Sequence, residues 1–456
     1  MKKLYAISLL AAMTMTLAGA STALVAQTTE TAGAAGQPNQ VVIKDQAEYQ
    51  AYTKAVGMTD PAQEAQALEA FLQQYPNTVV KKEALETLLS AYQKSQNSAK
   101  LLETAQRILE TDPNNVQSTL VVAYLKTTQA QQAAAQGTGQ NQQAVVQDYA
   151  DAAAAAQKAL ALLPSLPKPA GADEAAFQKQ KDQIAAAMNG TIGFSNYIKQ
   201  DYAAAVPNLF KAVQLNPQDY ANMEYLGQSM AKPNTREKMF SDPTAKMDLL
   251  AGVFWLSKAV SIAPAAAKDQ FTSVAKYYYN RYHGSQEGFD QALQQSATMN
   301  EPTPDFKITP VPSPQEQATQ VLASTPPEDI LPKLGFDTWA SILTVASPAD
   351  QEKVWNATKG KPLDLSGVVV GATNEQIQLA VSDAAQTDKR ADVILQLKTP
   401  MTTPPAVGTA DYEVVGTADS YVTTPKFALT LSNGEAKKKA PVKKAPVRRP
   451  VRRHPR

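Results

Sequence analysis

Residues 189–217 read NGTIGFSNYIKQDYAAAVPNLFKAVQLNP and contain the pattern that decides the fold of most of this chain. Apolar and small residues recur at helical spacing up to Ala212, and Pro217 follows five residues later. Proline cannot continue a helix and disfavours helical dihedral angles in the residue before it, so Pro217 marks a helix end. The same ending recurs at Phe71-x4-Pro76, Ile108-x4-Pro113, Ala159-x4-Pro164 and Ala259-x4-Pro264.

These five prolines lie 37, 51, 53 and 47 residues apart, which exceeds a 34-residue period by 3, 17, 19 and 13 residues. Two of the excesses equal the lengths of visible inserts, Ser165–Gln183 and Pro233–Ala245. A Gln-, Gly- and Ala-rich stretch from about Gln129 to Gln143 accounts for most of the excess of 17 residues. Without the inserts a helix–turn–helix repeat remains, and we expect the inserts to lie outside it. The alternative, a generic alanine-rich bundle, does not explain the period.

The repeat resembles the tetratricopeptide repeat (TPR) family, whose signature is W-x2-L-G-x2-Y, then A-x3-F, then P. The clearest copy consists of Asn189-x2-Ile192-Gly193-x2-Asn196, Ala205-x3-Leu209, Ala212 and Pro217. A second copy opens with Met223-x2-Leu226-Gly227 and closes with Gly252-x3-Leu256, Ala259 and Pro264. A third consists of Leu85, Leu88, Leu89, Tyr92, Leu101, Ala105, Ile108 and Pro113. The small residues would let neighbouring helices approach closely.

The resemblance implies a right-handed superhelix whose concave groove binds peptides or protein partners. The groove residues that it implies come from the first helices of the repeats: Glu86, Ser90, Gln93, Tyr124, Tyr197, Glu224 and Gln228. One charged subset of the family grips a partner's C-terminal carboxylate with Lys and Asn, whereas these positions offer Glu and Gln. For each single residue, an ordinary solvated helix face is the alternative interpretation.

A tyrosine-rich stretch, YYYNRYHG, covers residues 277–284 near the end of the expected helical region. Tyr278 and Tyr282 share a helix face because they are four residues apart. Gly284 is typical of a helix C-cap, and His283 lies where a cation or ring donor suits the last carbonyl groups. We therefore interpret this stretch as a packed helix end rather than as a catalytic site.

From Lys361 the hydrophobic period changes to two, and turn signals occur at Thr373-Asn374, Pro400–Gly408 and Ser432-Asn433-Gly434. The expected strands are Leu365–Val370, Ile377–Val381, Val393–Leu397, Tyr412–Thr417 and Phe427–Leu431. Five short strands in this length suit a small barrel. The arrangement resembles an OB-fold of the tRNA-anticodon-like type, with LSGVV at 365–369, VGT at 407–409, VVGT at 414–417 and LTLSNG at 429–434.

That family often binds oligonucleotides or oligosaccharides on its second and third strands. Here the corresponding segments, 377–381 and 393–397, carry no aromatic residue and little charge. Single-stranded nucleic acids need stacking aromatics and a basic groove, so nucleic-acid binding by the barrel is not expected. Docking of a protein or a carbohydrate by the barrel fits these residues no worse than nucleic-acid binding does.

The expected fold class is mainly α, a TPR-like helical solenoid followed by a small all-β, OB-like barrel and a disordered basic tail. The expected division of the chain is a signal peptide (1–26), a flexible linker (27–44), the helical repeat (45–300), a Pro-rich linker or packing strap (301–318), a short helical segment (319–360), the barrel (361–435) and the tail (436–456).

The N-terminus has the pattern of an export signal. Lys2 and Lys3 precede an uncharged, largely apolar run, and cleavage patterns end at Ala20 and Ala26. An uncleaved membrane anchor is the alternative, because Leu4–Ala26 is long enough to span a bilayer. The prediction is an exported protein of the periplasm or cell envelope.

The tail carries ten Lys and Arg and no acid, whereas the chain without this tail and without Lys2 and Lys3 has a net charge of −11. The basic residues are Lys437, Lys438, Lys439, Lys443, Lys444, Arg448, Arg449, Arg452, Arg453 and Arg456. Interspersed prolines favour an extended chain, and clustered cations bind polyanions through counterion release. The expected ligands are anionic lipid, lipopolysaccharide or an acidic surface such as the body of this chain, and a solubilising tail without a target is the alternative.

Composition excludes several kinds of chemistry. The chain has no cysteine, so disulfides, thiolate metal sites and cysteine nucleophiles are absent. Its two histidines, His283 and His454, cannot form a multi-histidine metal site. No cofactor, metal site or catalytic residue is predicted. The function predicted is a non-catalytic scaffold for protein or peptide partners, with nucleic-acid binding by barrel and tail, and an envelope carbohydrate-active enzyme, as alternatives.

Overall fold

The computed structural model describes residues 42–136 and 142–437. The predicted export signal and all of the basic tail except Lys437 therefore lie outside the described residues. The chain forms two compact units, one that ends at Val311 and one that begins at Pro312. The boundary falls within the segment 301–318 that was expected to link two domains.

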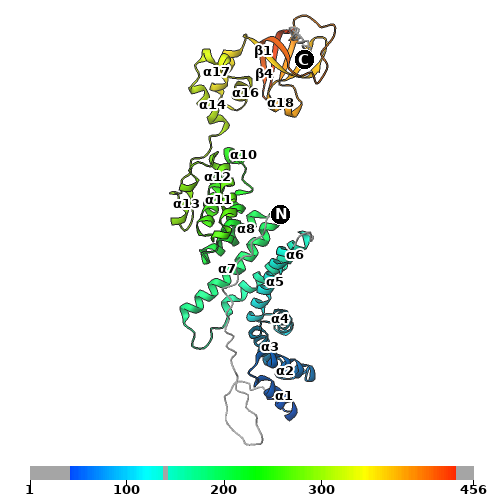
Figure 1. Ribbon diagram of the computed structural model, residues 1–456, viewed down its shortest axis with the longest axis vertical. Helices are drawn as coiled ribbons and strands as arrows, with labels where there is room; N and C mark the ends of the chain where they lie inside the picture. Colours follow the sequence, from blue (N-terminus) through cyan, green and yellow to red (C-terminus); the bar gives the residue numbers. More distant parts are fainter. Residues whose placement is uncertain (1–41, 137–141, 438–456) are drawn as a thin grey trace, which may run out of the picture. The chain divides into compact units, whose positions relative to one another are not determined.

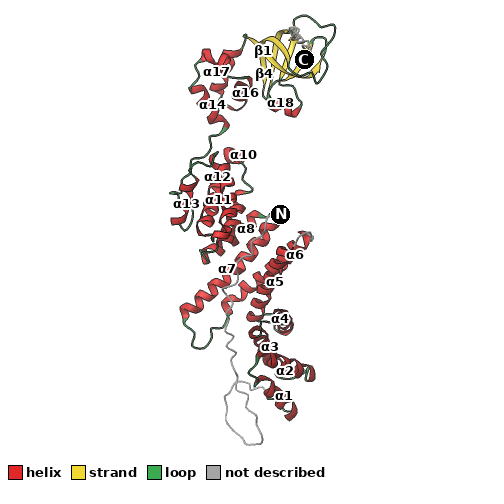
Figure 2. Ribbon diagram, viewed as in Figure 1, coloured by secondary structure: helices red, strands yellow, loops and turns green. Residues whose placement is uncertain are grey.

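The first unit consists of helices that pack as successive antiparallel pairs, which Figures 1 and 2 show. The helices are α1 (Gln46–Val56), α2 (Pro61–Gln74), α3 (Lys81–Lys94), α4 (Ser98–Thr111), α5 (Val116–Gln136), α6 (Gln142–Leu162), α7 (Glu174–Ile198), α8 (Tyr202–Leu215), α9 (Tyr220–Ala231), α10 (Arg236–Ser241), α11 (Pro243–Ile262), α12 (Ala265–His283) and α13 (Phe289–Thr298). The short 3-10 turn η1 (Leu163–Ser165) follows α6. The predicted mainly helical region is confirmed.

The prolines that set the predicted period do end helices in a common way. The backbone N–H of the residue before the proline donates to the residue four before it: Tyr75 to Phe71, Asp112 to Ile108, Asn216 to Ala212 and Ala263 to Ala259, at 2.8–2.9 Å. Pro164 differs, because it lies inside η1 rather than directly after a helix. Four of the five predicted helix ends therefore share one geometry.

The turns inside two of the pairs are also the same. Gln96 and Gln200 adopt positive φ angles of 57° and 63°. The N–H groups that follow, on Asn97 and Asp201, each donate 3.0 Å to a carbonyl five residues back, and the two side chains cap α4 and α8. This is the Schellman pattern followed directly by an N-cap.

Small residues allow the close helix crossings that the repeat pattern predicted. A Cβ atom on Gly193 would lie 2.6 Å from Cγ of Leu209, and one on Gly227 would lie 2.7 Å from Cγ of Leu256. Both glycines are on the first helix of a pair and both leucines on the second. A larger side chain at Gly193 would therefore push α7 and α8 apart, and one at Gly227 would push α9 and α11 apart.

The inserts do not all lie outside the repeat, and that expectation is wrong for Pro233–Ala245. Met239 of α10 is buried in the core of the first unit. Arg236 donates to the carbonyl oxygens of Asn280 and Arg281 at the end of α12, at 2.9 and 3.2 Å. Part of the insert 165–183 extends α7 to 25 residues. Insert residues therefore add helix and core, because their apolar side chains find partners on neighbouring helices.

The segment after α13 packs as a strap on the first unit. The Phe306 ring lies edge-on to Phe254, with ring centroids 5.1 Å apart. The N–H of Val311 donates 2.8 Å to the carbonyl of Tyr282, and His283 Nδ1 lies 2.6 Å from the carbonyl oxygen of Thr309. Gly284 adopts a left-handed conformation as the C-cap of α12, as its position predicted.

The second unit combines helices and a barrel around one core. Its helices are α14 (Pro314–Ala323), η2 (Pro327–Asp329), α15 (Ile330–Lys333), α16 (Phe336–Val345), α17 (Pro348–Thr358) and α18 (Asp383–Asp388). Trp339, Ile342 and Leu343 of α16 belong to the same buried cluster as barrel residues such as Leu395 and Leu431. The helical segment 319–360 and the strands that follow it are therefore one folding unit.

The strands β1 (Pro362–Ala372), β2 (Gln376–Ala380), β3 (Val393–Leu397), β4 (Tyr412–Val422) and β5 (Ala428–Ala436) form a closed barrel in the order β1-β2-β3-β5-β4. All pairs are antiparallel except β3 with β5. The predicted small β-barrel is confirmed. Its interior is filled by aliphatic side chains that alternate along the strands.

One predicted turn is wrong. Ser432-Asn433-Gly434 was expected to end the last strand, but these residues lie within β5 at an irregularity in its pairing with β3. Asn433 adopts a left-handed backbone conformation at this irregularity, with a φ of 53°. A Cβ on Gly434 would lie 2.4 Å from Cγ of Leu395, so glycine permits the close approach of the two strands.

Candidate functional site

Three of the seven predicted groove residues meet in one cluster. The Tyr197 hydroxyl on α7 donates to Gln228 Oε1 on α9 at 2.8 Å. Gln228 Nε2 in turn donates to Glu224 Oε1, one helical turn earlier, at 3.0 Å. Two successive first helices of the repeat therefore share a continuous chain of polar contacts, and Glu224 is almost fully buried within it.

A lysine that sequence reasoning missed completes this cluster. Lys232, the C-cap residue of α9, donates to the Tyr197 hydroxyl at 2.7 Å. Its Nζ lies 4.5 Å from the ring centroid of Tyr197 and 5.6 Å from that of Tyr202. Burial, with the nearby Glu224 carboxylate, raises the pKa of Tyr197 above its ordinary value. Tyr197 is thus a neutral donor with a cation above its ring.

The cluster continues onto α12 through the tyrosine-rich stretch. Arg281 lies over the rings of Tyr277 and Tyr278, at 5.1 and 4.9 Å, and donates to the Ala231 carbonyl of α9 at 3.2 Å. Burial raises the pKa of Tyr278 to about 12, although Arg281 opposes the shift. Tyr277 is 58% exposed, whereas Tyr278 is 5% exposed.

We call this set the tyrosine row. It joins α7, α8, α9 and α12 and consists of Tyr197, Tyr202, Glu224, Gln228, Lys232, Tyr277, Tyr278 and Arg281. The interpretation of residues 277–284 as a packed helix end holds for the buried Tyr278 but misses the exposed Tyr277. The signal that could have found it was the adjacency of three tyrosines, since neighbouring helix residues cannot all face the core.

The other four predicted groove residues lie on earlier helices. Glu86, Ser90 and Gln93 are half-buried on α3, and Glu86 forms a 4.0 Å ion pair with Lys82. Burial raises the pKa of Glu86 above its ordinary value. Tyr124 is half-buried on α5, where it packs against the hydrophobic cores of the first unit.

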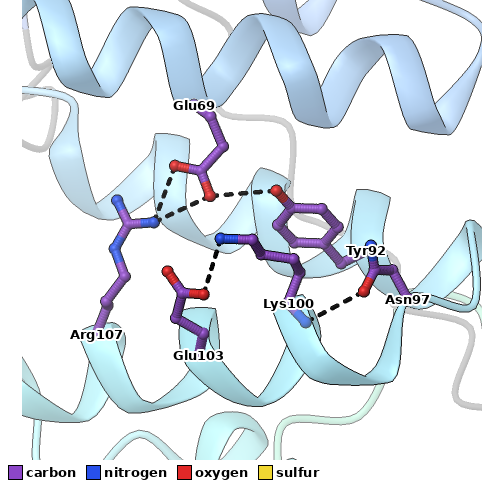
Figure 3. A network of polar contacts seen from close by, with 6 residues as sticks. All are labelled: Glu69, Tyr92, Asn97, Lys100, Glu103 and Arg107. Atoms are coloured by element: carbon purple, nitrogen blue, oxygen red, sulfur yellow. Dashed lines mark hydrogen bonds and ion pairs between the residues drawn. The ribbon is translucent and has the colours of Figure 1, made fainter.

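A second polar cluster, which the sequence did not suggest, joins α2, α3 and α4 (Figure 3). Arg107 Nη1 contacts both carboxylate oxygens of Glu69, at 3.2 and 3.0 Å. The Tyr92 hydroxyl donates to Glu69 Oε1 at 3.2 Å, and Lys100 pairs with Glu103 at 2.8 Å. These contacts are mutually satisfied, so the cluster ties the first two helix pairs together.

Within residues 42–136 and 142–437, no group of three or more His, Asp or Glu side chains could hold a metal ion. No helix in this part of the chain is long and apolar enough to cross a membrane. Searches against protein-family models and curated proteins found no match for this sequence.

Proposed function

We propose that this protein is an exported, non-catalytic interaction scaffold with TPR-type repeats, and that the tyrosine row binds a peptide segment of a partner protein. Two features support the TPR assignment. The turns at Gln96 and Gln200 are alike, and Gly193 and Gly227 each cross a leucine of the partner helix. In the barrel, the closed strand order with a parallel β3–β5 pair supports the OB-like assignment.

One observation carries the peptide-binding proposal: aromatic rings and cations from α7, α8, α9 and α12 are concentrated in the tyrosine row, and one ring, Tyr277, is largely exposed. Tyrosine and arginine are enriched in protein interfaces because they bury a large area at a low cost in conformational entropy. Tyr277 has the further advantage that Arg281 donates to its hydroxyl at 2.8 Å and holds its ring in place. A pre-ordered aromatic side chain loses little freedom when a partner covers it.

The proposal is tested by photo-cross-linking. A photoreactive phenylalanine analogue at position 277 should capture a discrete partner in envelope extract. The matched control is the same analogue at position 247 on α11, because Met247 is 66% exposed but lies outside the tyrosine row. The captured partner should bind the Tyr277→Ala variant about tenfold more weakly, which corresponds to about 1.4 kcal/mol, and should bind Met247→Ala normally. Equal capture at both positions would refute the proposal.

Export is tested separately. N-terminal sequencing of the native protein should begin near Ser21 or Gln27, because small residues precede both positions. Recovery of intact Met1 from a soluble cytosolic fraction would contradict export. The same photo-cross-linking at position 277 in cytosolic extract would then test the binding role of the tyrosine row independently of export.

A further inference from the structure

The second unit has an apolar hollow on its surface, next to the first residues of β1. Its volume is about 410 Å³. It is lined by α15, α16 and β1 with the residues Leu331, Pro332, Leu334, Phe336, Trp339, Pro362, Leu363, Asp364 and Leu365. Asp364 is the single charged side chain in this lining, and its side chain is 60% exposed. The hollow thus offers prolines, rings and leucines, with one carboxylate at its edge.

The described chain ends beside this hollow. Lys437 is the last described residue and the first basic residue of the tail. Its N–H donates 3.0 Å to the carbonyl of Glu413, which extends the pairing of β5 with β4. Its ammonium group forms an ion pair with Asp364 across β4. The first cation of the tail therefore already contacts the one carboxylate that lines the hollow.

Charge also favours the second unit as the binding surface for the tail. Residues 312–437 contain 15 Asp and Glu and 9 Lys and Arg, whereas residues 42–311 contain 26 and 23. The second unit thus has a larger net negative charge than the first unit, although it is only about half as long. Residues 438–456 contain nine Lys and Arg and no acid. Opposite net charges on a tethered segment and its own unit raise the local population of contacts.

The tail also contains apolar groups that match the hollow. Its charged pairs are separated by Pro441-Val442, Pro446-Val447 and Pro450-Val451. Proline-rich segments bind aromatic-lined grooves because their extended conformation is largely formed before binding. Val442 is five residues beyond Lys437, and five extended residues span at most about 17 Å. The first Pro-Val pair therefore comes within reach of a hollow whose edge Lys437 already contacts.

We propose that the hollow is the docking site of the chain's own basic tail, with Pro441-Val442 against the apolar lining and the Lys437–Asp364 ion pair at its start. The docked tail covers the hollow and is held on the second unit. An anionic surface that binds the start of the tail must then compete with the hollow and with Asp364 at its edge. Binding of Lys437–Val442 to a polyanion and occupancy of the hollow by the same residues therefore compete.

The absence of cysteine from the chain allows a direct test by disulfide cross-linking in the full chain. One variant combines Val442→Cys with Pro332→Cys, which is exposed at the hollow. The control combines Val442→Cys with Val407→Cys, which is 69% exposed and does not line the hollow. The control is stringent because the N–H of Gly408 donates to Val369 of β1, so Val407 lies beside the same strand.

At low salt, the Pro332 pair should form an intrachain disulfide at least about tenfold faster than the Val407 pair, which corresponds to about 1.4 kcal/mol of preference. Asp364→Lys in the same background, or 1 M salt, should reduce the rate to that of the control, because both remove the attraction between opposite charges. Thermal melts should show that Asp364→Lys leaves the fold intact. Equal rates for the two pairs would overturn the proposal, as would unchanged preference in Asp364→Lys. A disulfide-linked dimer in dilute protein would assign the hollow to a second copy and would also overturn it.

Discussion

Two helix pairs 104 residues apart, α3/α4 and α7/α8, share the same turn but pack with exchanged volumes. In α7/α8 the first helix contributes Gly193 and the second Leu209. The corresponding positions in α3/α4 are Leu89 and Ala105, and both are buried in the core. The backbone turn is thus conserved while the large side chain moves from one helix to the other. What the repeat preserves at the crossing is total volume, because helix interfaces are close-packed.

The two regions also differ in how neighbouring pairs are joined. Between α2 and α4, Arg107 and Glu69 form an ion pair, with the Tyr92 hydroxyl as a third member. Around α7, aromatic rings meet instead: Phe194 lies 4.6 Å from Tyr225 and 4.8 Å from Tyr149 between ring centroids. The first kind of contact depends on charge and pH, whereas the second depends on shape and burial.

The sharpest test of the exchanged volumes is at positions 193 and 209. Leu209→Ala should destabilise the first unit by about 2–5 kcal/mol, because it leaves a cavity in a fully buried site. Gly193→Leu should cost about 1–3 kcal/mol by overpacking the crossing. The double variant recreates the arrangement of Leu89 and Ala105, so it should cost clearly less than the sum. Urea denaturation followed by circular dichroism measures each free energy of unfolding.

Lys179→Ala is the control for these substitutions, since Lys179 is exposed on α7 of the same unit. It should change stability by less than about 0.5 kcal/mol. If the costs at 193 and 209 add to within about 0.5 kcal/mol, the two sites do not share volume and the comparison fails.

A smaller effect distinguishes the polar contact of the α3/α4 region. Burial, together with the charge and hydrogen bond of Glu69, raises the pKa of Tyr92 from 10.0 to about 12. Between these values the unfolded chain loses the phenolic proton while the folded protein keeps it. The contribution of Tyr92 to stability is therefore complete below pH 10 and is lost as the pH rises to 12.

The stability difference between the wild-type protein and Tyr92→Phe should shrink in this window by about 1.4 kcal/mol per pH unit. Denaturation curves at successive pH values measure it. Glu69→Gln should narrow the pH range over which this stability difference changes, because it removes a charge that raises the pKa of Tyr92. A difference that stays constant from pH 9 to pH 12 would show that Tyr92 is not shielded as the structure indicates.

The smallest effect tests what the two pairs share. Because Gln96 and Gln200 both have positive φ angles, Gln96→Gly and Gln200→Gly should each stabilise the protein by up to about 1 kcal/mol. The control Lys179→Gly, on the exposed face of α7, should instead cost about 1 kcal/mol. If denaturation experiments show that Gln96→Gly stabilises the protein while Gln200→Gly destabilises it, or the reverse, the two turns are not equivalent.

Local rules made much of the fold predictable from the sequence. Prolines such as Pro113 and Pro217 end helices because the ring blocks the helical backbone, whereas Pro207 lies inside α8. Strand alternation located all five barrel strands, and β3 has the predicted bounds. The small residues Gly193 and Gly227 indicated close crossings because only a missing side chain allows them.

Tertiary structure alone decided which side chains meet. Tyr197 and Gln228 were predicted as separate groove positions, but their contact, and the place of Lys232 above the ring, depend on how α9 packs on α7. The strand irregularity at Asn433 is equally invisible to local rules, because the same residues form turns elsewhere. Local sequence predicted four helix ends and the position of each strand, since backbone sterics act within a few residues. Contacts between residues far apart in the chain depend on the packing of whole helices and strands, which no local pattern specifies.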